Sequence, residues 1–169
     1  MNNPLRIALG DLRHRTIGKH SIYAPLGIGF LASHVLQTMP KDSVEVRLYE
    51  DPDDMLADAD KWRPQVVGLA NYCWNAELNQ AIFSLIKEDR PDTITVCGGP
   101  EFPPELEERA AYLASRPEID FYCPNEGEVA FLKLIGNVVA GENLKTLQLT
   151  PQYGMMTLDP DSAEPVIGP

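Results

Sequence analysis

Short apolar runs alternate with helical patterns along most of this chain. Five runs are typical of strands, at residues 5–9, 44–49, 66–70, 94–97 and 119–123. Several of them are apolar almost throughout, as expected for strands whose two faces are both covered by helices. Between them, apolar residues recur at helical spacing near 25–39, 55–62, 78–86, 104–115 and 129–139. This order predicts an α/β fold: a doubly wound, Rossmann-like (flavodoxin-like), five-stranded parallel sheet with helices on both faces.

The pattern changes near the carboxyl end of the chain. Two short apolar stretches, 147–149 and 154–158, precede the turn sequence at 159–161. They predict a small C-terminal β-hairpin or edge strands, with a proline-containing exit. We therefore expect residues 1–142 to form the Rossmann-like domain and residues 143–169 to form an extension that leads toward a further domain.

The loops that follow three strands carry small and polar residues. Carboxyl ends of parallel strands meet at one edge of a sheet, where ligands bind in open α/β folds. Glycine lets a ligand approach the backbone closely, and an adjoining helix start offers free amides. The three loops contain Asn71, Tyr72 and Cys73; Gly98, Gly99 and Pro100; and Glu126, Gly127 and Glu128. The first helix adds Gly27 and Gly29 near its start, for close packing or for a ligand.

The composition of the chain argues against two classes of partner, nucleic acid and membranes. The net charge of −11 opposes the binding of nucleic acid and of anionic membrane surfaces. No apolar run has the length of a signal peptide core or a membrane span, so we expect a cytoplasmic protein without a membrane or nucleic-acid partner.

Three cysteines are too few and too far apart for a disulfide framework or a compact metal motif. Cys73, Cys97 and Cys123 follow or end successive strands. A converging set of thiols is geometrically possible there, but buried inert cysteines are the simpler interpretation.

Four segments taken together resemble the cobalamin-binding domain of cobalamin-dependent radical SAM enzymes, in order and in spacing. They lie at residues 25–32, 66–70, 96–100 and 125–131, and the resemblance spans roughly residues 4–140. It implies a cobalamin-binding module, in which the corrin ring lies on the carboxyl edge of the sheet and the nucleotide tail enters between strands and loops. The cofactor-binding residues that we expect are Asp11, His14, Tyr23, Pro25, Leu26, Gly27, Asn71, Tyr72, Cys73, Gly98, Gly99, Pro100, Glu126, Gly127 and Glu128.

The loop after the first strand differs from the Asp-x-His-x-x-Gly motif of methionine-synthase-type cobalamin domains. Asp11, His14 and Gly18 occur in that order, with one extra residue in each interval. His14 is therefore the candidate axial ligand of cobalt, and Asp11 is a candidate to orient it.

The radical SAM centre implied by the resemblance needs three cysteines at Cys-x-x-x-Cys-x-x-Cys spacing, which this sequence lacks. A 4Fe–4S cluster and S-adenosylmethionine would therefore bind in a covalently linked radical SAM domain outside this sequence. This chain alone is expected to be non-catalytic, while the parent protein is an enzyme, with methyl transfer as one candidate reaction.

Other functions stay open at this point. A flavodoxin-like domain that binds FMN or another phosphorylated ligand shares the predicted fold, although residues 11–19 lack the usual Ser/Thr/Gly phosphate loop. A protein-interaction module with a vestigial cofactor site would expose Tyr72, Trp74 and Phe102. A self-contained enzyme has the least support, because no nucleophile with a paired base is evident.

Overall fold

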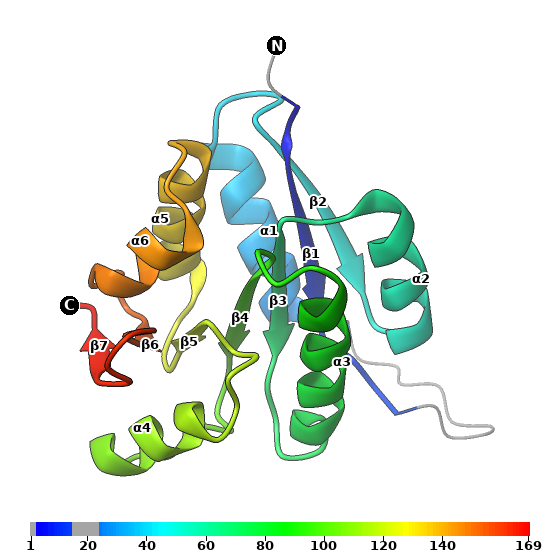
Figure 1. Ribbon diagram of the computed structural model, residues 1–169. Coiled ribbons are helices and arrows are strands. Elements are labelled where there is room, and N and C mark those ends of the chain that lie inside the picture. Colours follow the sequence, from blue (N-terminus) through cyan, green and yellow to red (C-terminus); the bar gives the residue numbers. More distant parts are fainter. Residues whose placement is uncertain (1–2, 15–23) are drawn as a thin grey trace.

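The computed structural model describes residues 3–14 and 24–169, and its strands form one seven-stranded sheet (Figure 1). The strand order is β2-β1-β3-β4-β5-β6-β7, and the first five strands are mutually parallel. The strands are β1 (Leu5–Gly10), β2 (Val44–Tyr49), β3 (Val66–Ala70), β4 (Ile94–Gly98), β5 (Phe121–Cys123), β6 (Met156–Leu158) and β7 (Pro165–Ile167). The order 2-1-3-4-5 is that of flavodoxin-like doubly wound sheets, which confirms the predicted α/β class.

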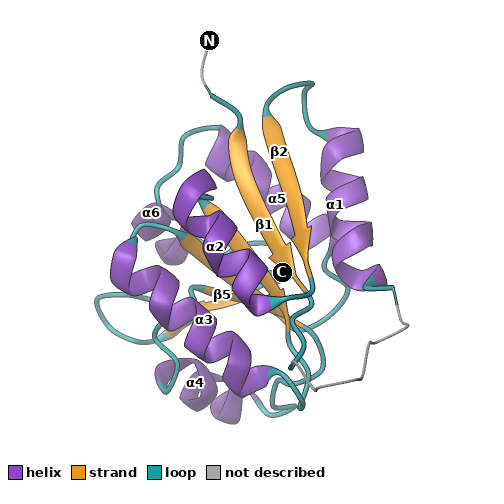
Figure 2. Ribbon diagram, turned by 90° about the vertical axis from the view of Figure 1, so that its right-hand side faces the viewer, coloured by secondary structure: helices purple, strands orange, loops and turns teal. Residues whose placement is uncertain are grey.

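Six helices cover the two faces of the sheet within the described residues. They are α1 (Leu26–Thr38), α2 (Pro52–Trp62), α3 (Ala76–Asp89), α4 (Leu106–Ala114), α5 (Glu128–Val139) and α6 (Leu144–Leu149). The core on one face joins α1, α5 and α6 to the strands, and the core on the other joins α2, α3 and α4. In Figure 2, α2 and α3 lie in front of the strands and α5 lies behind them.

The predicted strand count was wrong. β6 pairs antiparallel with β5, and β7 pairs antiparallel with β6, so the sheet continues into the carboxyl-terminal part of the chain. Residues 147–149, which we expected to be extended, belong to helix α6. Asn143 caps this helix, because its side chain accepts a hydrogen bond from the Thr146 amide at 3.0 Å, and Leu147 is buried in the core.

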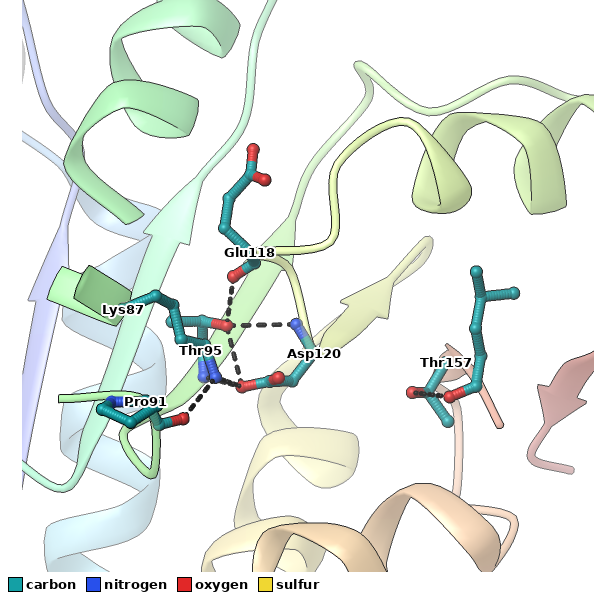
Figure 3. Close-up of polar contacts among 7 residues, drawn as sticks. Lys87, Pro91, Thr95, Glu118, Asp120 and Thr157 are labelled. Carbon is teal, nitrogen blue, oxygen red and sulfur yellow. Dashed lines mark hydrogen bonds and ion pairs between the residues drawn. The ribbon is translucent and has the colours of Figure 1, made fainter. Parts of the chain in front are cut away.

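A buried ion pair fastens α3 to the amino ends of two strands (Figure 3). Lys87 Nζ lies 2.6 Å from Asp120 Oδ2. The same carboxylate oxygen accepts hydrogen bonds from the Thr95 amide at 2.7 Å and from Thr95 Oγ1 at 2.9 Å. Burial raises the pKa of Asp120, against the opposing effects of Lys87 and Thr95. These contacts hold the helix and the strands in fixed relative positions.

None of the described helices is long and apolar enough to cross a membrane.

Candidate functional site

A cavity of about 240 Å³ opens at the carboxyl ends of β3, β4 and β5, beside the starts of α1 and α5. It brings together seven of the residues singled out in the sequence: Gly27, Tyr72, Gly98, Gly99, Glu126, Gly127 and Glu128. The rest of its lining was not among the predicted cofactor-binding residues, although most of it lies in the four segments that carry the resemblance; it is Ile28, Leu31, Gly68, Leu69, Ala70, Val96, Cys97, Cys123, Asn125, Phe131 and Met155. These residues are mostly apolar, so the walls of the cavity are largely apolar.

Small residues keep the cavity open, and Gly27 is the clearest case. A Cβ atom built on Gly27 meets no other atom within 4 Å. A Cβ on Gly127 would lie 3.2 Å from Leu31 Cδ2, and one on Gly98 would lie 3.4 Å from the Cys123 carbonyl oxygen. A larger side chain at Gly27 therefore has free space to occupy, whereas side chains at the other two glycines would press on the walls.

The backbone conformation at position 99 requires glycine. Its φ is +128°, a conformation that L side chains rarely adopt. A Cβ atom there would lie 2.5 Å from the carbonyl oxygen of Asn71. Gly99 was predicted to lie in the cleft; in the structure its lack of a side chain also lets two neighbouring loops touch.

Asn71 ties those two loops together. It is 1% exposed, and its Nδ2 lies 3.1 Å from the Glu101 carbonyl, 3.0 Å from Tyr112 Oη and 3.1 Å from Tyr122 Oη. Tyr122 Oη lies 3.1 Å from the Gly99 carbonyl oxygen and 2.9 Å from the Glu101 carbonyl oxygen, and it can donate its proton to either of them. Burial raises the pKa of both tyrosines. The Asn71 side chain thus holds the β4–α4 loop, which forms one wall of the cavity.

Two further buried asparagines extend this polar network along α3. Asn79 Nδ2 donates to the Ala70 carbonyl at 3.0 Å and to Asn71 Oδ1 at 3.1 Å. Asn75 Nδ2 donates to the carbonyls of Leu12 and Ala70, both at 3.1 Å, and its Oδ1 accepts from the Tyr72 amide at 2.8 Å. The network therefore fixes the ends of β1 and β3 before any ligand is present.

Exposed apolar side chains occur on the first turns of α1 and in the β3–α3 loop. Leu26, Phe30 and Trp74 are 64%, 57% and 59% exposed. The Trp74 ring stacks on Tyr72, which lines the cavity, with 4.5 Å between centroids and 6° between planes. Large apolar groups exposed beside a cavity are typical of a surface that a ligand or partner covers.

His14 lies at this edge but does not line the cavity. Its Nε2 is 3.0 Å from the carbonyl oxygen of Trp74. A carbonyl can only accept, so Nε2 is the donor of this hydrogen bond, and in the neutral imidazole Nδ1 is then the nitrogen with the lone pair. Among the described residues, no hydrogen bond joins Asp11 to His14; the Asp11 amide donates to the Tyr49 carbonyl at 3.0 Å. Partial burial raises the pKa of Asp11, and the Glu50 charge adds to this while Arg13 opposes it.

Four other predicted residues, Pro25, Leu26, Cys73 and Pro100, do not line the cavity. Pro25 and Leu26 begin α1, Cys73 is exposed in the β3–α3 loop, and Pro100 follows Gly99. Tyr23 lies outside the described residues. Glu126 and Glu128 line the cavity. Neither of them caps α5, because the N-cap residue of this helix is Gly127, which has no side chain to cap it.

The cysteines face different surroundings. Cys97 and Cys123 line the cavity and are buried, and burial raises the pKa of both thiols. Cys73 is exposed. Within residues 3–14 and 24–169, no group of three or more His, Cys, Asp or Glu side chains is placed to hold a metal ion.

The fold and the site define a class: a Rossmann-like α/β domain with an apolar cavity at the carboxyl edge of its sheet. No family model matches the chain. It is 33% identical over 72 residues to the cobalamin-dependent radical SAM methyltransferase TokK of Streptomyces tokunonensis. The same identity and length relate it to a 2-(S-pantetheinyl)-carbapenam-3-carboxylate methyltransferase of Streptantibioticus cattleyicolor. Each match covers 43% of this chain and 10% of the relative, so the chain spans about a tenth of the length of these curated relatives.

Solved structures share the fold over nearly the whole chain. The cobalamin-dependent S-adenosylmethionine radical enzyme OxsB, with aqua-cobalamin and S-adenosylmethionine bound, superposes with a TM-score of 0.72 at 20% identity. That match covers 98% of this chain and 22% of the OxsB chain. A cobalamin-binding protein from Desulfitobacterium hafniense matches with a TM-score of 0.54 at 16% identity, over 80% of this chain and 59% of its own. The predicted resemblance to the cobalamin-binding domains of cobalamin-dependent radical SAM enzymes is confirmed.

Proposed function

We propose that this chain is a cobalamin-binding module of a cobalamin-dependent radical SAM enzyme. The observation that carries the proposal is the apolar cavity at the carboxyl edge of the sheet, on a fold shared with OxsB. In open α/β sheets this edge is where ligands bind. The relatives' names support methyl transfer as the reaction of the whole protein.

The size of the cavity indicates which part of cobalamin it would hold. At about 240 Å³ it lies below the range of pockets that enclose a whole drug-sized ligand, so the much larger corrin stays outside it. The nucleotide tail would enter beside Gly27, Gly98 and Gly127. The corrin would then cover the exposed rim of Leu26, Phe30 and the stacked Tyr72–Trp74 pair.

The chain's own residues bind and orient, and the cofactor supplies the organometallic chemistry of its cobalt. Asn71 positions the cavity wall through the β4–α4 loop. His14 is the candidate axial ligand, through Nδ1, because its Nε2 is engaged by Trp74. The other proposed contacts are Asp11, Pro25, Cys73, Pro100, Glu126 and Glu128, with Tyr23 outside the described residues. The 4Fe–4S cluster and S-adenosylmethionine would belong to a covalently linked radical SAM domain.

Two glycines of α1 provide a matched test of the site. Gly27 and Gly29 both have open space around a built Cβ, but only Gly27 lines the cavity. Each position lies in the first turns of the helix, where replacing glycine does not weaken helix propensity. Gly27→Phe would fill the cavity entrance, and Gly29→Phe is the control.

Hydroxocobalamin is titrated into the wild type and both variants, with the visible spectrum and calorimetric heat as readouts. We expect saturable binding that Gly27→Phe weakens at least about tenfold, corresponding to 1.4 kcal/mol, while Gly29→Phe changes it little. Circular dichroism checks that each variant is folded. Equal binding by both variants, or binding of FMN in place of cobalamin, would contradict the proposal.

A further inference from the structure

A second groove, of about 390 Å³, lies at the amino edge of the sheet, opposite the cavity. Arg6 is the second residue of β1, Gln65 precedes β3 and Thr93 precedes β4, so the groove sits where the parallel strands begin. Arg63 and Arg90, at the carboxyl ends of α2 and α3, complete its basic lining. Three arginines therefore line one groove in a chain of net charge −11, together with two aspartates, Asp89 and Asp92.

Among the described residues, the ion pairs of these arginines involve Asp89 and not Asp92, and they are weak. Arg63 Nη2 is 3.8 Å from Asp89 Oδ2, and both side chains are more than half exposed, at 53% and 57%. An ion pair that long and that exposed contributes little. The same Asp89 oxygen is 3.3 Å from Arg90 Nε, which is buried without a hydrogen bond. One exposed carboxylate thus lies near two guanidinium groups.

Arg6 makes no ion pair with any described residue. Its Nε and its backbone amide both point to Gln65 Oε1, at 3.4 and 2.9 Å. Arg90 is anchored instead by its Nη1, which donates to the Ala59 carbonyl at 2.6 Å. Burial lowers the pKa of Arg90, and the charges of Arg63 and Arg6 lower it further, although Asp89 and Asp60 oppose them. The like charges are close enough to repel one another.

Arg63 also occupies an unusual backbone position. It ends α2 with φ of 51°, a left-handed conformation in which glycine is the residue of lowest cost. An arginine at this position brings a long cationic side chain to the groove. The hydroxyl of Thr93 makes no hydrogen bond with the described residues, so it remains available as a further donor beside the arginines.

We propose that this groove binds the phosphate group of a small anionic ligand. Arg6 and Arg63 would hold it, with the Thr93 hydroxyl and the side-chain amide of Gln65 as additional donors. A phosphate offers three acceptor oxygens, which suit several donors at once, and the planar guanidinium fork matches it in a bidentate geometry. Arg90, which also lines the groove, adds positive charge. Asp89 moves toward Arg90 alone when the ligand takes its place at Arg63. The site is independent of the cobalamin proposal, since it lies at the other edge of the sheet.

The test is a titration of the full 169-residue chain followed by amide NMR shifts, with inorganic phosphate, pyrophosphate and ADP as separate probes. Ionic strength is held constant with sodium chloride, so that screening does not change. We expect saturable shifts centred on Arg6, Gln65 and Thr93 with at least one probe, and the comparison of probes separates a free phosphate from a nucleotide.

Variants decide whether the arginines carry the binding. The double variant Arg6→Gln/Arg63→Gln should weaken it at least about tenfold, because each lost guanidinium removes a charge-assisted hydrogen bond. Lys133→Gln/Lys145→Gln removes the same charge from exposed positions elsewhere and should leave binding unchanged. Gly27→Phe should also leave it unchanged, which distinguishes this groove from the cavity. Shifts that do not saturate, or that are equal in the arginine and lysine variants, would overturn the proposal.

Discussion

Replacing Lys87 with methionine isolates the electrostatic part of the ion pair that fastens α3 to the sheet. Methionine keeps an unbranched side chain of similar length and removes the charge. In the wild type, Lys87 Nζ is 2.6 Å from Asp120 Oδ2, and the two side chains are only 15% and 5% exposed. Lys87 Nζ also donates to the Pro91 carbonyl at 3.2 Å. In the variant, the Asp120 carboxylate stays buried with only Thr95 as a partner.

The expected loss is large because a buried charge is left uncompensated. Removing one partner of a buried pair typically costs about 3–5 kcal/mol, against a total stability of about 5–15 kcal/mol for a domain. We expect Lys87→Met to lower the free energy of unfolding by about 3–5 kcal/mol near pH 7.5. Adding Asp120→Asn removes the charge and keeps an oxygen that accepts from Thr95, so the double variant should recover part of the loss.

The loss should also depend on pH in a defined direction. Burial raises the pKa of Asp120 in the folded state, and removal of Lys87 raises it further. A carboxyl group whose folded pKa exceeds its unfolded pKa penalises folding at pH values above the folded pKa, and the penalty fades as the pH falls through it. The deficit of Lys87→Met relative to the wild type should therefore be smaller near pH 5 than near pH 7.5.

Urea unfolding at these two pH values measures both effects, and Lys61→Met is the matched control. Lys61 is an exposed lysine in the last turn of α2, so its replacement should change stability by no more than about 0.5 kcal/mol. A deficit for Lys87→Met below about 1 kcal/mol, or one that is equal at both pH values, would refute the reasoning.

Two further variants test the carboxyl edge of the sheet. Asn71→Ala removes the donor shared by Glu101, Tyr112 and Tyr122 and should lower the free energy of unfolding by about 2–4 kcal/mol in urea, because buried acceptors lose their partner; a change under about 0.5 kcal/mol would contradict the assigned role. His14→Ala should change the visible spectrum of bound hydroxocobalamin if Nδ1 coordinates cobalt, and an unchanged spectrum would exclude His14 as the axial ligand.

The parallel part of the fold was predictable because its signals are local. Strands such as Val66–Ala70 are apolar on both faces, and helix patterns separate them at regular intervals. Topology then places the carboxyl ends together, which is why Gly27, Tyr72, Gly98 and Gly127 could be assigned to one site before the structure was known.

The carboxyl-terminal part was not predictable in the same way. Leu147, Gln148 and Leu149 alternate as a strand does, but Asn143 caps a short helix and Leu147 packs into the core. The pairing of Tyr122 with Met156 joins residues far apart in the sequence, and no local pattern encodes it. For the same reason the wall residue Met155 was not predicted, since it resembles an ordinary core residue until long-range packing places it at the cavity.

The glycines show how one residue type serves two physical purposes at the same edge. Gly99 permits a φ of +128° and contact with the Asn71 backbone, so any side chain there would disturb the loop before it reached a ligand. Gly27 has a helical backbone, and a Cβ atom built on it would lie in empty space. Its lack of a side chain therefore matters only for what occupies that space. Loss of binding in a Gly99 variant would therefore be ambiguous between misfolding and obstruction. Loss in Gly27→Phe, with Gly29→Phe intact, would report on the cavity itself.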